Sequence, residues 1–116
     1  MVSISDTIVA LSTAQGGAIS VIRLSGDKSI TIADKILTSR TPLKDVARNT
    51  IVYGHIANEN GGIIDEVLLS LFKNPKSYTG EDVVEISCHG SAYIISTIIS
   101  LLIHHGARLA EHGEFT

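Results

Sequence analysis

Residues 77–90 read SYTGEDVVEISCHG, a pattern that predicts a glycine turn, a buried strand and a second glycine opening into a helix. Side chains alternate along a strand, so Val84, Ile86 and Cys88 fall on one face and Glu85 on the other. An ionised carboxylate in a largely apolar strand is costly unless a partner donates a hydrogen bond to it. Glu85 is therefore the first candidate for a ligand contact, although an exposed glutamate without any partner fits the same pattern.

Upstream of this stretch, the chain alternates between β-rich segments and one amphipathic segment. Residues 6–11 and 18–24 favour strands, with a Gly-Gly turn signal between them, and the pattern leaves open whether they pair. Apolar residues at helical spacing then predict a helix that begins at Asp27, as its N-cap, and ends at about Thr38. Residues 39–48 contain a proline and are expected to form a loop.

The second half of the chain predicts three strands and one long helix. The predicted elements are a hairpin of residues 50–56 and 63–72 around a turn at 58–62, a break at 74–77, the strand 82–88, a helix capped by Ser91 and closed by Gly106, and a short segment at 108–110. The apolar stripe of the helix consists of Ile94, Ile95, Ile98, Ile99, Leu102 and Ile103. The order ββαβββα predicts an α+β fold with a mixed, mainly antiparallel sheet and helices on one face.

Composition narrows the class of protein. A chain of 116 residues fits one domain, residues 1–116, and its net charge of −3 with scattered basic residues argues against autonomous nucleic-acid binding. One cysteine excludes an internal disulfide framework and fits a reducing compartment.

The N-terminus lacks the pattern of a signal peptide, and the apolar stretch 92–103 is too short to span a bilayer. We expect a cytoplasmic protein without a membrane partner. The charged and aromatic segment 111–116 favours a domain excised from something longer.

Arg23 is the second candidate site residue. It ends an apolar run, and alternation places it on one face with Ile19 and Val21, which is an unusual setting for a charge. Its fixed fork of donors suits a carboxylate, which can belong either to Glu85 or to a ligand. An Arg–Glu pair that merely links two strands is an equally simple interpretation.

Other chemistries find little support in the sequence. Cys88 and His89 are adjacent on a strand, so they point apart and make neither a chelating pair nor an activated thiolate. The other histidines lack the spacing of a zinc site, and no phosphate-binding G-x-x-x-x-G-K-[ST] loop is present. We therefore expect no metal site and no catalytic residues in this segment.

Several separated motifs resemble one known family. They are Asp6-Thr7-Ile8-Val9-Ala10, Gly16-Gly17, Ile22-Arg23-Leu24-Ser25-Gly26, Ser77 through Glu85, Cys88-His89-Gly90, Gly106-Ala107-Arg108-Leu109-Ala110 and Gly113-Glu114-Phe115-Thr116. In this order they resemble the N-terminal domain of the tRNA modification GTPases called MnmE or TrmE, over residues 6–116. The chain departs from the family at three places. The family commonly has two prolines and a basic residue where this chain has Ser12-Thr13-Ala14-Gln15, Gly-Gly-Pro where it has Gly90-Ser91-Ala92, and proline where it has His112.

The resemblance implies a fold, a cofactor and partners. The fold is that of the folate-binding half of the glycine-cleavage T-protein, and the domain dimerises with its opening strands crossing between subunits. It binds a 5-formyl-tetrahydrofolate-type cofactor near the interface. The full-length protein, a GTP hydrolase that uses GTP, Mg²⁺ and K⁺, adds a helical domain and a G domain. With an MnmG-type flavoprotein, it modifies carbon 5 of the wobble uridine of tRNA.

Two positions match the folate contacts of the family, and they are Arg23 and Glu85. A pterin presents an N–H beside an amino group, which Glu85 can hold with two bonds, while Arg23 suits carbonyl or carboxylate oxygens. Further cofactor-binding lysines of the family lie beyond Thr116, so the resemblance implies an incomplete site. The rival hypothesis is a structural dimerisation module in which the two side chains pair across strands and bind nothing.

Overall fold

The computed structural model describes residues 6–13, 16–47, 49–73 and 81–111. Its elements are β1 (Ile8–Leu11), β2 (Ile19–Ser25), α1 (Ser29–Ile36), β3 (Leu37–Thr38), the 3-10 turn η1 (Leu43–Asp45), β4 (Thr50–Ala57), β5 (Ile63–Phe72), β6 (Val83–His89), α2 (Ala92–His104) and β7 (Arg108–Leu109). The fold is α+β, as the element order predicts. The expected break at 74–77 and the motif residues 77–80 and 113–116 lie outside the described residues.

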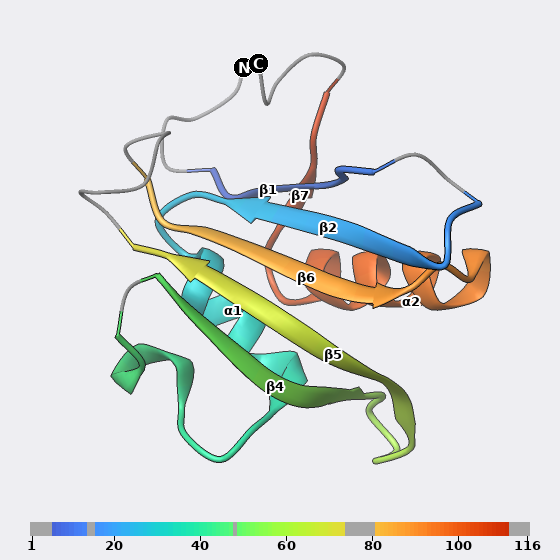
Figure 1. Cartoon of the computed structure of the whole chain (residues 1–116). Helices are drawn as coiled ribbons and strands as arrows, with labels where there is room; N and C mark the ends of the chain where they lie inside the picture. The colour runs from blue at the N-terminus through green and yellow to red at the C-terminus, as the bar shows by residue number, and fades with distance from the viewer. Residues whose placement is uncertain (1–5, 14–15, 48, 74–80, 112–116) are drawn as a thin grey trace.

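The strands form a single mixed sheet in the order β3-β4-β5-β6-β2-β1-β7. All neighbours are antiparallel except β1 and β7, which run parallel at one edge. The two opening segments do pair with each other, with Ala10 opposite Arg23. The prediction of a mainly antiparallel sheet is confirmed, and β6 lies near its centre between β5 and β2 (Figure 1).

Both helices cover the same face of the sheet (Figure 1). The row Val84, Ile86 and Cys88 on β6 is buried beneath them, as the alternation predicts. Neighbouring strands add fully buried side chains to this layer, including Ile22, Leu24, Leu69 and Leu71. Burial of these aliphatic side chains is the main stabilising contribution, at about 1.5–3 kcal/mol each. On the opposite face, the described part of the chain places no helix (Figure 1).

The first helix differs from its prediction at both ends. Its N-cap is Lys28, which makes no side-chain cap bond, and Asp27 is exposed, so the predicted cap is wrong. The reason is tertiary, because the Lys28 N–H donates instead to Thr7 Oγ1 at 3.1 Å. The helix ends at Ile36, since Leu37 and Thr38 leave it to pair with β4 as strand β3.

The second helix follows its prediction closely. Ser91 caps it by accepting a hydrogen bond from the Ile94 N–H at 3.3 Å, and Gly106 has a positive φ of 118° just beyond its end. The buried stripe stops before Ile103, which is 41% exposed. Among the described residues, no helix has the length and apolar character needed to cross a membrane.

Candidate functional site on the uncovered face of the sheet

Arg23 and Glu85 lie side by side on the sheet face that the helices leave uncovered. They occupy neighbouring strands β2 and β6, where the antiparallel register places them directly opposite each other. Each is flanked along its own strand by buried residues of the core, such as Ile22 and Ile86, whose side chains point to the helices. Strand alternation together with this register therefore brings together the two residues that the sequence selected.

The two side chains form an ion pair through one carboxylate oxygen. Arg23 Nε donates to Glu85 Oε2 at 2.8 Å, and Arg23 Nη2 donates to the same oxygen at 2.6 Å. Each side chain keeps 23% of its surface exposed, so water screens the pair and its net stabilisation is below about 1 kcal/mol. Glu85 Oε1 accepts no hydrogen bond from any described residue, which leaves a charged acceptor available on this face.

Two small side chains lie beside Glu85 on the uncovered face, and a hollow lies beside Arg23. Ser70 lies opposite Glu85 on β5, and Ser87 follows on the same face of β6, so the neighbours of the carboxylate are small. On the other side, Arg23 borders a cavity of about 190 Å³ together with Ala10, Leu11 and Ser12 at the end of β1. The face therefore offers a guanidinium that borders a hollow, and a carboxylate hydrogen-bonded to that guanidinium.

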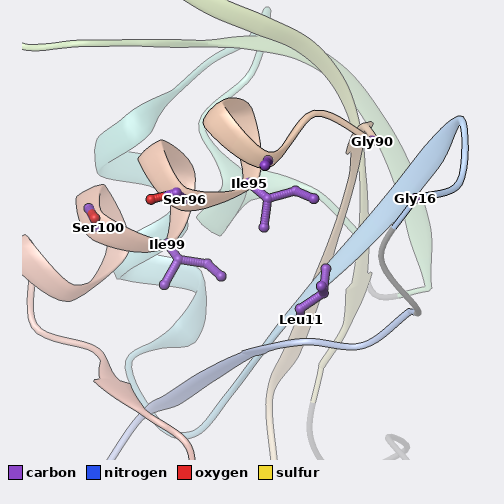
Figure 2. Close-up of a pocket in the computed structure, with 8 residues that line it drawn as sticks. Leu11, Gly16, Gly90, Ile95, Ser96, Ile99 and Ser100 are labelled. Atoms are coloured by element: carbon purple, nitrogen blue, oxygen red, sulfur yellow. The ribbon is translucent and has the colours of Figure 1, made fainter.

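A larger cavity of about 460 Å³ lies on the helix side, between α2 and the β1–β2 connection (Figure 2). Ile95 and Ile99 of α2 point across it toward Leu11 of β1, and Gly90 lies at one end. Its described lining residues are all uncharged. None of these described residues presents a charged acceptor to a ligand, so we place the candidate site at the smaller hollow beside Arg23.

A second polar pair, Asp65 and His89, was missed by the sequence analysis. Asp65 is only 8% exposed and accepts two hydrogen bonds from His89, one from its backbone N–H at 2.8 Å and one from Nδ1 at 2.7 Å. The imidazole itself is 69% exposed. The signal was present in the row Val67, Leu69 and Leu71, because extending this alternation two residues back places Asp65 in the core layer.

Cys88 and His89 point to different environments, as expected from adjacent strand positions. The thiol is buried, and burial together with the nearby charge of Asp65 raises the pKa of Cys88 to about 11. The thiol therefore stays protonated at neutral pH and is a poor nucleophile. Within the described ranges, no three His, Cys, Asp or Glu side chains are grouped so that they can hold a metal ion.

Comparison with known proteins gives one consistent family. The family described as "GTP-binding protein TrmE N-terminus" matches residues 7–116. Proteins named tRNA modification GTPase MnmE from Acetivibrio thermocellus, Enterococcus faecalis and Bacteroides fragilis are each 51% identical to this chain over 96% of its length. The chain spans about a quarter of the length of these relatives, 25%, 24% and 24% respectively. The chain belongs to the family of TrmE N-terminal domains.

Proposed function

We propose that this chain is the folate-binding, dimer-forming domain of a cytoplasmic tRNA-modifying GTPase that acts on carbon 5 of the wobble uridine. The names of its relatives support a role in tRNA modification. In this proposal GTP, Mg²⁺ and K⁺ bind outside the segment, and the MnmG-type flavoprotein and tRNA are partners of the full-length protein. The segment itself supplies a 5-formyl-tetrahydrofolate-type cofactor site and a homodimer interface.

The observation that carries the cofactor proposal is the placement of Arg23 and Glu85 together on the uncovered face. A pterin carries an N–H beside an amino group, and a carboxylate is the acceptor that matches this pair of donors. Among the described residues nothing donates a hydrogen bond to Glu85 Oε1, and Arg23, which lines the nearby hollow, suits the oxygen atoms of the same ligand. These residues fit the cofactor, which would supply a one-carbon unit when bound.

The rival function is a structural dimerisation module without a ligand. Arg23 pairs with Glu85 across two neighbouring strands, so the geometry suits that role too. Calorimetric titration of the 116-residue chain with 5-formyl-tetrahydrofolate separates the two. Saturable binding supports the cofactor site. Its absence, also in a version extended to include the downstream lysines, supports the structural module.

Glu85→Gln is expected to weaken folate binding by roughly 1–3 kcal/mol while leaving the fold intact. The substitution keeps the shape of the side chain but replaces one acceptor oxygen with a donor, so one pterin N–H loses its partner. Glu66→Gln is the matched control, because Glu66 is an exposed glutamate of β5 away from Arg23. Titration of both variants measures the difference, and an unchanged affinity of Glu85→Gln removes this residue from the site.

The proposed dimer interface is the apolar part of the same uncovered face. Ile51, Tyr53 and Leu68 are large exposed residues on β4 and β5, and Tyr53 lies directly opposite Leu68. Leu68→Glu is expected to weaken the dimer at least about tenfold, because a carboxylate would have to be desolvated in the interface. Ile103→Glu on α2 changes a comparably exposed residue on the other side and should leave the dimer unchanged. Sedimentation over a concentration series tests both, and a wild-type mass that stays monomeric throughout contradicts the proposal.

A further inference from the structure

We infer that Arg23 occupies the ligand's place on Glu85 and has to release one carboxylate oxygen when a ligand with two adjacent N–H donors binds. This inference rests on the proposed function, since it concerns the same site. It makes the ion pair an autoinhibitory contact, in which the protein's own guanidinium competes with the ligand for the carboxylate.

Arg23 uses only one of the two oxygens of the Glu85 carboxylate. A carboxylate oxygen has two lone pairs, and both on Oε2 accept from Arg23, from Nε at 2.8 Å and from Nη2 at 2.6 Å. Oε1 is left with both of its lone pairs. A planar ligand edge with two parallel N–H groups needs one bond to each oxygen. It therefore cannot form its second bond until Arg23 gives up at least one of its own.

Arg23 is placed so that it can move away from Glu85. Both side chains are 23% exposed, so a departing guanidinium is rehydrated rather than stranded in the core. Arg23 already borders the hollow formed with Ala10, Leu11 and Ser12, which gives its side chain a second position beside the ligand. There its donors can bind ligand oxygens, so the same residue changes from competitor to contact.

The two roles of Arg23 can be separated with a ligand probe whose only hydrogen-bond acceptors for Arg23 are those of its ring. Pterin, 2-amino-4-oxopteridine, has the two-donor edge but no carboxylate tail. In the Arg23→Met variant the competitor is removed and the length of the side chain is kept. We expect this variant to bind pterin about fivefold more tightly than wild type, the size of effect expected from a partly exposed ion pair.

Two further variants keep the experiment decisive. Arg23→Lys retains the charge without the fixed two-donor fork, so its pterin affinity is expected to lie between those of wild type and Arg23→Met. Arg108→Met removes another partly exposed, ion-paired arginine, which contacts Asp6 at 3.1 Å on the edge strand β7, two strands from Arg23, and should leave pterin affinity unchanged. Circular dichroism confirms that each variant is folded.

The outcomes distinguish this inference from the proposed function. Tighter pterin binding by Arg23→Met, and by Arg23→Lys to a smaller degree, supports competition. Unchanged or weaker binding by both variants, with wild type still binding, overturns it and makes Arg23 a positioning residue for Glu85. If neither wild type nor any variant binds pterin or 5-formyl-tetrahydrofolate, the proposed function fails and this inference fails with it.

Discussion

The Gly90→Ala variant is expected to lose about 3 kcal/mol or more of unfolding free energy, well beyond the cost of a typical single substitution. A Cβ at this position would lie 1.8 Å from the carbonyl oxygen of Gly17 and 2.9 Å from its carbonyl carbon. Both contacts are with backbone, so no flexible side chain can move aside. The Gly90 N–H also donates to the Ala18 carbonyl at 2.9 Å, which holds the two segments together.

The test of this prediction has a control at the other side of the same contact. In Gly17→Ala the added Cβ would meet only the Ile19 carbonyl oxygen, at an ordinary 3.5 Å, so this variant should be close to wild type. Urea denaturation followed by circular dichroism gives both free energies. A loss below about 1 kcal/mol for Gly90→Ala would mean that the β1–β2 connection does not rest on the end of β6 in solution.

Asp65→Ala is expected to cost about 3 kcal/mol, the second largest effect among these variants. The buried carboxylate accepts both the backbone N–H and Nδ1 of His89, so its removal leaves a backbone donor of the β6 end without a partner. It also leaves a small void in a layer of fully buried aliphatic residues, including Leu69 and Ile86. Both effects act in the same direction.

Two related variants show how much of this loss of unfolding free energy comes from each of the two hydrogen bonds between His89 and Asp65. Asp65→Asn keeps one acceptor oxygen and should lose only part of the stability. His89→Ala removes the exposed imidazole but leaves the backbone bond, so it should cost less than Asp65→Ala. Thermal and urea denaturation of the three proteins provide the comparison. Equal losses for His89→Ala and Asp65→Ala would assign the stabilisation to the side-chain pair instead of the backbone N–H.

The strand pattern of the sequence was enough to select Arg23 and Glu85 as the two candidate site residues. Alternation alone assigned each to a face, since a side chain on a strand must point to one side or the other. It did not assign neighbours, because the pairing of β2 with β6 joins residues 62 positions apart in the chain. Whether Arg23 would meet Glu85 or a ligand was left open, and only the register decided that it meets Glu85.

Asp65 is the opposite case, because its role depends on a residue of another strand. The sequence predicts residues 63–72 as half of an ordinary hairpin and assigns no role to Asp65. Its position in the buried row of β5 becomes meaningful only when β6 supplies the donors of His89. Short-range pattern contains no information on which distant N–H will satisfy a buried carboxylate.

Local sequence was sufficient for the α+β class, the types of the longer elements, the N-cap of α2 by Ser91 and the two faces of β6, because each depends on neighbours within about one helical turn or two strand residues. Tertiary structure decided the strand order, the early end of α1 at Ile36, the use of Thr7 in place of Asp27 at the start of that helix, and the joining of Arg23 to Glu85. These features depend on contacts between segments far apart in the chain, and their energies exceed the small local preferences that a sequence displays.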